Sequence, residues 1–264
     1  MHAFEYHRPS STKDALSLGK NEEAKYLAGG QSLVQAMKLR LSSPTDLVDL
    51  GTIKELAGIK ATGSGVEIGA MTRHADVAGS PEVKKAIPAL AALAGIIGDR
   101  QVRHMGTMGG SLANSDPAAD YPAAVLALGA TITTNKRKIE ADDFFKGLYE
   151  TALEPGELIT SVAFPAPKRA AYMKFKNPAS RFAIVGVFVA DFGGKVRVAV
   201  TGAGPCAFRQ SDMEKALAAK FAPESVANIK VKPGGLNNDL HASPEYRAHL
   251  ISVMAKRAVE AALQ

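Results

Sequence analysis

In the first fifty residues, some apolar positions recur with the period of a strand and others with the period of a helix, and turn residues separate these segments. Ser11, with Asp14 three positions later, marks the start of a helix whose apolar face begins at Ala15. Residues 25–28 form a short run that ends at a pair of glycines, after which apolar residues recur at helical spacing. The pattern predicts a strand at 25–28, a helix through 33–41 that Ser42-Ser43-Pro44 ends, and a strand at 47–50.

The middle of the chain, residues 51–167, mixes short strands with apolar helices. A helical stretch over 82–97 contains Pro88, which either kinks the helix or divides it in two. Residues 98–120 carry four glycines and are predicted to form a long loop shaped for close backbone approach. The other predicted elements are a helix at 121–128 and strands at 66–69, 131–133 and 158–164, with Pro165-Ala166-Pro167 as a hinge.

The last hundred residues have a separate pattern. Strands are predicted at residues 172–176, 184–191 and 195–201, and Phe192-Gly193-Gly194 joins the last two as a hairpin. Helical periodicity then dominates and ends in a helix over 246–263. These patterns predict an α+β fold in three parts: residues 1–50, residues 51–167, and a C-terminal domain over 168–264 with a three-stranded sheet and helices.

The chain has enough hydrophobic residues to form a core, but no apolar segment long enough to span a membrane. The chain has 264 residues, 46% of them hydrophobic, and no run of 18 apolar residues that could span a membrane. Its start shows no basic and apolar pattern of a secretory signal, so we expect a cytoplasmic protein. The single cysteine, Cys206, excludes an internal disulfide and an iron–sulfur cluster held by four thiolates of this chain.

The net charge of +6 raises the question of nucleic acid. The basic residues are spread along the chain, and the one basic run, residues 136–138, is followed by Glu140, Asp142 and Asp143. A solvated turn accounts for that run, and a nucleic-acid-binding module is the weakest hypothesis. The positive charge is also suited to a polyanionic cofactor or an acidic partner subunit.

Two glycine-containing segments carry the candidate chemistry. The first, residues 28–33, reads Ala-Gly-Gly-Gln-Ser-Leu between a strand and a helix, and the second contains Gly-Gly-Ser at 109–111 after Thr107. Glycines admit a ligand close to the backbone, and the free N–H groups of a helix start favour an anionic diphosphate. Turn geometry alone is the alternative for the first segment. A turn at Asp116-Pro117 and a helix cap at Asp120 are the alternatives for the second.

Other common site patterns are missing from the sequence. Neither glycine segment fits the Walker pattern, and no G-x-G-x-x-G opens a helix. None of the six histidines forms a zinc-protease motif, and no catalytic acid–base pair or metal site is predicted.

The two segments, in this order and at this separation, resemble those of the FAD-binding medium subunit of the molybdenum hydroxylases, the carbon monoxide dehydrogenase and xanthine dehydrogenase family. The resemblance covers nearly the whole chain. Residues 4–9, 47–50 and 239–247 also look like the opening, a second motif and the closing segment of that family. It implies a two-subdomain FAD-binding fold of the PCMH type, followed by a C-terminal domain of the CO dehydrogenase flavoprotein type.

The resemblance also implies site residues. It places Ala28, Gly29, Gly30, Gln31, Ser32, Leu33, Thr107, Gly109, Gly110 and Ser111 around the diphosphate, Asn114, Asp116 and Asp120 toward the ribityl and ribose groups, Ile97 and Ile159 near the adenine, and Lys174 and Phe182 at the isoalloxazine. A surface strand lysine is the alternative for Lys174, and ordinary core packing is the alternative for Phe182. Phe182 stands where relatives often carry Tyr or an aliphatic residue.

The implied function is electron transfer within a larger enzyme. FAD would be bound noncovalently, since no His or Cys is placed for a tether. It would receive electrons from a small [2Fe–2S] subunit fed by a large molybdopterin subunit, and would pass them to an external acceptor. The resemblance suggests a dimer of heterotrimers. A stand-alone FAD-dependent oxidoreductase is the alternative. The hydroxylated substrate and the acceptor (quinone, oxygen or NAD) stay open.

Overall fold

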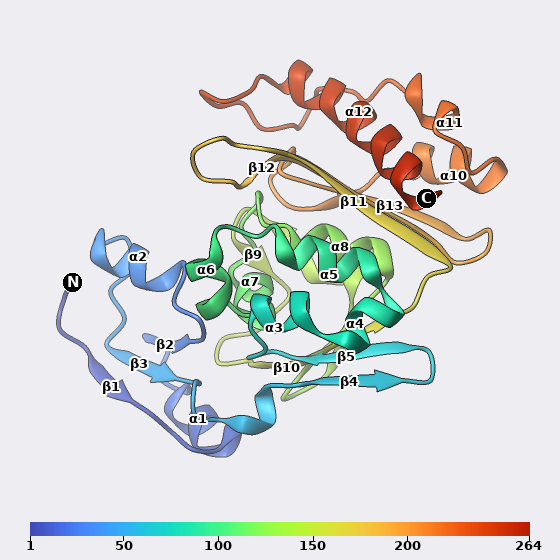
Figure 1. The fold of residues 1–264 in the computed structure, drawn as a ribbon. Coiled ribbons are helices and arrows are strands. Elements are labelled where there is room, and N and C mark those ends of the chain that lie inside the picture. The colour runs from blue at the N-terminus through green and yellow to red at the C-terminus, as the bar shows by residue number, and fades with distance from the viewer.

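The computed structural model describes all residues from 1 to 264, and its three main sheets follow one another along the chain (Figure 1). The first sheet is parallel, in the order β1 (Glu5–His7), β3 (Asp46–Asp49) and β2 (Ala24–Leu27). The helices α1 (Thr12–Leu18) and α2 (Leu33–Lys38) connect these strands. The side chain of Ser11 caps α1 by accepting a hydrogen bond from the Asp14 N–H, as its sequence predicts.

The second helix ends earlier than its apolar pattern indicates. Helix α2 stops at Lys38, and Arg40 follows in the left-handed region with φ 61°. Leu41 therefore lies outside the helix and is 79% exposed, so its assignment to the apolar face of α2 was wrong. Periodicity does not register a left-handed turn, because that turn depends on one residue's backbone angle.

The middle part is built on a five-stranded antiparallel sheet, which helices cover. The strand order is β4 (Ile59–Thr62), β5 (Gly65–Gly69), β10 (Ile159–Pro165), β6 (Thr131–Thr134) and β7 (Lys138–Glu140). Its helices include α3 (His74–Gly79), α4 (Pro81–Ala86), α5 (Pro88–Gly95), α8 (Tyr121–Leu128) and α9 (Ala141–Phe144), with the short strands β8 (Phe145–Gly147) and β9 (Glu150–Thr151) after them. Pro88 thus divides the predicted helical stretch rather than kinking it.

The predicted long loop over 98–120 is wrong for most of its length. It contains two short helices, α6 (Arg100–Met105) and α7 (Met108–Asn114). The Asp99 carboxylate caps the first by accepting from the Val102 N–H at 2.8 Å, and Thr107 caps the second. Gly109 is helical despite its low propensity because α7 packs closely: a Cβ there would lie 2.6 Å from the Cβ of Ala70.

The C-terminal sheet has four strands rather than the predicted three. The order is β11 (Arg169–Lys176), β12 (Ala183–Asp191), β13 (Val196–Thr201) and β14 (Phe208–Arg209), all antiparallel. The added strand is only two residues long, too short for a period-2 pattern to reveal. The predicted hairpin at Gly193 and Gly194 is confirmed, since both have positive φ and both donate to Asp191.

Strand β12 is buried on both of its faces, and alternate residues serve two cores. Val185, Val187 and Val189 pack against the helices α10 (Ser211–Ala219), α11 (Glu224–Ala227) and α12 (Pro244–Ala262). Phe188 and Ala190 point the other way, into the core that contains residues of α5 and α8. Figure 1 shows these two helices beneath the C-terminal sheet. The C-terminal sheet is therefore fixed directly onto the middle part of the chain.

The division at residues 50 and 167 falls between the strands of successive sheets. Buried residues cross both points: Leu158 packs with the N-terminal core, and Tyr172 packs with the middle core. The division into three domains stays a prediction. None of the helices is long and apolar enough to cross a membrane.

A buried carboxylate ties the β6–β7 turn to the segment before β10. Glu157, whose side chain has no exposed surface, accepts hydrogen bonds from Thr134, Arg137 and the Glu154 N–H. Burial alone would raise the pKa of Glu157, but these bonds outweigh it and lower the pKa from 4.5 to about 2. A depressed pKa stabilises the fold above pH 4.5, and this stability is lost as the pH falls towards 2.

We therefore expect Glu157→Gln to lower the free energy of unfolding by about 2 kcal/mol at pH 7. The matched control is Glu154→Gln, which removes a carboxylate 53% exposed beside the same arginine and should cost under about 0.5 kcal/mol. Urea unfolding at pH 7 and at pH 3 measures both variants. Equal losses for the two variants, or a Glu157→Gln loss that does not shrink at pH 3, would contradict the expectation.

Candidate functional site

The two glycine segments, about 75 residues apart in sequence, touch each other in the structure. A Cβ added at Gly29 would overlap the carbonyl oxygen of Met105 and would lie 2.6 Å from the Cα of Gly106. A Cβ added at Gly110 would lie 3.3 Å from the Cβ of Ala28. The missing side chain at Gly29 thus allows the segment after β2 to rest on the backbone between α6 and α7.

The first segment presents a row of unpaired backbone donors. None of the N–H groups of residues 29–33 donates a hydrogen bond to another group of the chain. The hydroxyl of Ser32, at the start of α2, makes no capping bond either. Backbone N–H groups are normally paired, and consecutive free ones that surround a glycine turn form a concave binding site for anions.

The second segment is held from behind. The His74 N–H donates to the Gly106 carbonyl and the Met108 N–H donates to the Thr72 carbonyl, both at 3.0 Å. The hydroxyl of Thr107 accepts from the Gly110 N–H at 3.2 Å. Gly109 is buried against Ala70, so it supports the segment, whereas Gly110 and Ser111 are partly exposed beside the first segment.

Asp120 and Lys174 come together from different parts of the chain. The Lys174 ammonium donates to an Asp120 oxygen at 2.9 Å, and the Tyr172 hydroxyl donates to the other oxygen at 2.6 Å. Burial raises the pKa of Asp120, although Lys174 and Tyr172 act in the opposite direction. The exposed strand position considered for Lys174 is wrong, since its side chain is 3% exposed.

Asp116 and Phe182 do not line the Asp120–Lys174 pair but a separate cavity. It has a volume of about 310 Å³ and lies between the start of β12 and the segment after α7. Phe182 is 47% exposed there, so the core-packing alternative for it is wrong. Asp116 accepts from the Ala118 N–H at 2.8 Å and from the Tyr149 hydroxyl at 3.4 Å. Asn114 is partly exposed at the end of α7.

The two predicted adenine contacts differ in exposure. Ile97 is partly buried at the end of α5, next to the Ile96 carbonyl that accepts from Lys174. Ile159 is 3% exposed and belongs to the core of the five-stranded sheet. The structure does not bring Ile159 to a surface beside the glycine segments, and a role for it at the adenine stays a prediction.

Two buried polar side chains, Tyr172 and His74, lie near the predicted site residues and were not predicted from the sequence. Tyr172 shares a strand face with Lys174, and spacing by two positions could have linked them. His74 lies against Gly106, and its Nδ1 is buried without a partner. Burial, with Arg103 nearby, lowers the pKa of His74 to about 4, so the ring is neutral at pH 7. No sequence pattern indicated this packing.

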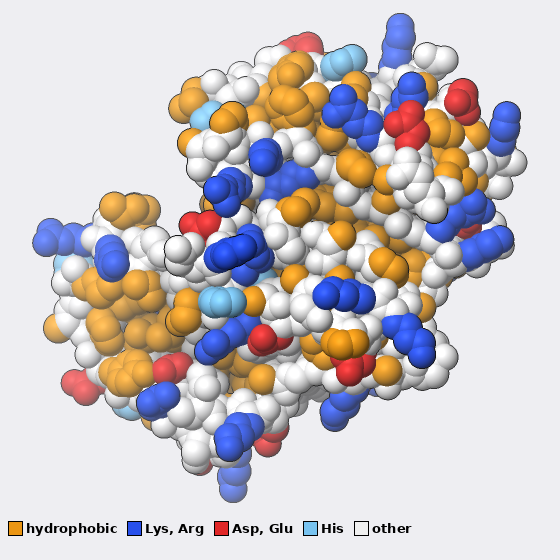
Figure 2. All heavy atoms as spheres, in the orientation of Figure 1, with side chains coloured by type: hydrophobic (Ala, Val, Ile, Leu, Met, Phe, Trp, Pro, Cys, Tyr) orange, Lys and Arg blue, Asp and Glu red, His pale blue; other side chains and the backbone are white.

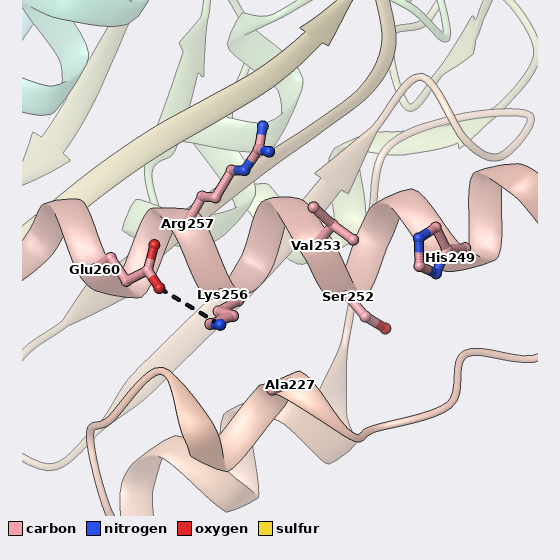
Figure 3. A pocket seen from close by; sticks show the side chains of 7 residues that line it. All are labelled: Ala227, His249, Ser252, Val253, Lys256, Arg257 and Glu260. Carbon is pink, nitrogen blue, oxygen red and sulfur yellow. Dashed lines mark ion pairs between the residues drawn. The ribbon is translucent and has the colours of Figure 1, made fainter.

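The surface is hollowed on the face drawn in Figure 2. Figure 2 shows a hollow between the N-terminal lobe and the C-terminal sheet, bordered by Lys and Arg side chains. A larger cavity of about 370 Å³ lies elsewhere, between α11 and α12, and Figure 3 shows the side chains that line it. They are mostly polar residues of one helix face, such as His249 and Lys256, and none belongs to the predicted site.

A family described as the FAD binding domain in molybdopterin dehydrogenase matches residues 2–167. The chain belongs to this family. It is 37% identical to the carbon monoxide dehydrogenase medium chain of Hydrogenophaga pseudoflava, over 98% of this chain and 96% of that one. It is 35% identical to the nicotine 6-hydroxylase medium subunit of Paenarthrobacter nicotinovorans, over 97% and 96%.

Solved structures agree with this assignment. The carbon monoxide dehydrogenase of Hydrogenophaga pseudoflava matches with a TM-score of 0.88 at 36% identity, covering 99% of this chain and 98% of that one. Quinoline 2-oxidoreductase from Pseudomonas putida 86 matches with a TM-score of 0.89 at 30% identity, covering 99% and 97%. These matches confirm the resemblance and the fold class that the sequence implied.

FAD, the cofactor of the family, fits the groups that the structure presents. The five free N–H groups of residues 29–33 suit an anionic diphosphate. The missing side chains at Gly29 and Gly110 let the two segments that would hold it lie against each other. The start of α2 adds its positive end. The contact of each individual residue with FAD stays a prediction.

The geometry of the second segment depends on one cap. We expect Thr107→Val, which keeps the shape but removes the hydroxyl that accepts from Gly110, to lower the free energy of unfolding by about 1 kcal/mol. Thr107→Ser keeps the oxygen and serves as the control. Thermal and urea unfolding measure both, and equal stability of the two variants would show that the cap does not hold α7.

Proposed function

We propose that this chain is the FAD-binding electron-transfer subunit of a multi-subunit molybdenum hydroxylase. The observation that carries the proposal is the contact between the two glycine segments, which leaves five backbone N–H groups unpaired at one place. It is supported by similarity to medium chains over nearly their whole lengths. The chain is an oxidoreductase subunit whose substrate chemistry takes place on another chain.

The proposed partners are a large molybdopterin subunit and a small [2Fe–2S] subunit, arranged as a dimer of heterotrimers. Electrons would pass from the iron–sulfur subunit to FAD and then to an external acceptor. A single cysteine leaves this chain without the thiolates for a cluster of its own. We also propose a cytoplasmic location.

When bound, FAD supplies the redox chemistry, and this chain binds and orients it. Residues 28–33 and 107–111 would hold the diphosphate through backbone N–H groups. Asn114 and Asp116 would face the ribityl and ribose hydroxyls. Phe182 would cover a face of the isoalloxazine, and Lys174 would lie at its edge. Asp120 was expected to face the sugar hydroxyls, and both of its oxygens already accept hydrogen bonds from side chains.

A stand-alone FAD-dependent oxidoreductase is not favoured. Similar proteins are described as medium chains or subunits, including the glyceraldehyde dehydrogenase medium chain of Sulfolobus acidocaldarius at 35% identity over 97% of this chain. A binding module without redox function is likewise not favoured, because the fold of the whole chain follows that of these enzyme subunits.

The glycine contact gives a direct test of the proposed binding site. We expect Gly29→Ala to weaken FAD binding by tenfold or more, because the added methyl group overlaps Met105 and forces the two segments apart. Gly63→Ala is the matched control, since a Cβ there meets nothing within 4 Å. FAD titration of the apoprotein, with thermal unfolding alongside, measures both. Unchanged affinity in Gly29→Ala would remove the first segment from the site.

A second test addresses the complex. The chain purified from its native host under gentle conditions is expected to show flavin absorption near ~450 nm, a property of the cofactor, and to carry one larger and one smaller partner chain. A visible spectrum and identification of the co-purifying bands provide the measurement. A colourless single chain that also takes up no added FAD would contradict the proposed function.

A further inference from the structure

Asp120 and Lys174 form the one ion pair of the structure in which both side chains are nearly inaccessible. Their side chains are 4% and 3% exposed, whereas every other ion pair has at least one side chain that is 30% exposed or more. Removing two charges from water costs several kcal/mol per ion, and a hydrophobic pair of the same volume is often as stable. A contribution to the stability of the fold therefore does not explain why the chain has a buried ion pair here.

The position of Asp120 excludes the usual structural role of an aspartate before a helix. It immediately precedes α8, but its side chain makes no capping bond to that helix. The carboxylate instead faces β11, where it accepts from Lys174 and from Tyr172. Asp120 thus serves the lysine rather than its own helix.

Lys174 has donor capacity left over. An ammonium carries three N–H bonds. One is directed to Asp120 and a second, at 3.4 Å, to the Ile96 carbonyl, and no acceptor within the chain is found for the third. Ile96 is 47% exposed, so the ammonium lies close beneath the surface at the end of α5. This is the same end of β11 that leads to Phe182.

We propose that Asp120 is a positioning residue: it fixes the Lys174 ammonium beside the proposed FAD site, so that the pair, and not the lysine alone, governs the affinity and the midpoint potential of the bound flavin. The inference rests on the proposed function, because it needs FAD at this cleft. It adds a role for Asp120 beyond contact with the sugar hydroxyls. An ammonium without its counter-ion in a buried site releases its proton more readily.

Two further titratable groups face the pair. Burial, together with the Asp120 carboxylate, raises the pKa of both Tyr172 and Tyr121, so both stay neutral from pH 6 to pH 9. The two tyrosines therefore cannot cause a pH-dependent change in the flavin potential in that range. A change that appears when Asp120 is replaced, and disappears when Lys174 is replaced as well, is assigned to Lys174.

The test compares the full chain loaded with FAD in five forms: unchanged, Asp120→Asn, Lys174→Met, the double variant, and Asp191→Asn. The last removes a carboxylate of equal burial, paired with Arg169 at the other end of β12. The flavin midpoint potential and the FAD dissociation constant are measured from pH 6 to pH 9, with thermal unfolding of each form.

We expect Asp120→Asn to show a step in the potential against pH that the unchanged chain, Lys174→Met, the double variant and Asp191→Asn all lack. Its FAD affinity should fall by about tenfold more between pH 6 and pH 9 than that of the unchanged chain. A profile parallel to that of the unchanged chain, with only lower thermal stability, would reduce the pair to a structural role and overturn the inference. Persistence of the step in the double variant would also overturn it.

If Asp120→Asn does not fold, Lys174→Met decides the question. The inference then requires roughly tenfold weaker FAD binding in Lys174→Met than in Asp191→Asn, and equal binding overturns it. Failure of the proposed function is distinguishable from all of these results, because in that case the unchanged chain itself takes up no FAD, and the inference falls with it.

Discussion

The close contact of the segment after β2 with the backbone between α6 and α7 is the constraint on which the candidate site depends. It requires the absence of a side chain at Gly29, since a Cβ there would overlap a carbonyl oxygen. The contact joins a parallel three-stranded sheet to an antiparallel five-stranded one. Beside this contact, the N–H groups of residues 29–33 have no partner in the chain and are available to a ligand.

The C-terminal sheet fixes the remaining wall of the site. Its central strand β12 is buried on both faces, so the sheet cannot move away from α5 and α8 without exposing a core. That packing holds Lys174 beside Asp120 and places Phe182 at the surface where β11 turns into β12. An electron-transfer subunit needs this kind of rigidity, because the protein tunes a flavin by placing fixed charges and dipoles around it.

The buried charges fall into two kinds. Glu157 accepts four hydrogen bonds from groups within about 25 residues in sequence, and it secures a turn. Asp120 and Lys174 are 54 residues apart and connect the start of α8 to strand β11. The first has an evident structural use, whereas the second lies where we propose that FAD binds.

The sequence by itself determined the fold class, the family and most elements of the C-terminal part. The strands on either side of Phe192-Gly193-Gly194 and the helix before the C-terminus could be predicted, because those elements follow from local residue patterns. The two glycine segments also predicted a candidate site, since glycine pairs at helix starts are local features. The end of α2 at Lys38 and the two-residue strand β14 had no such signal.

Only the tertiary structure decided what fills residues 98–120 and which side chains meet. Helix α7 contains two glycines that disfavour a helix, and it forms because Gly109 packs on Ala70 and Thr107 caps it. The pairing of Asp120 with Lys174 and the burial of Ile159 likewise depend on elements distant in sequence. Periodicity reports which face of an element is apolar, but it does not report which element covers that face, and that contact decides the burial and the partners of each charge.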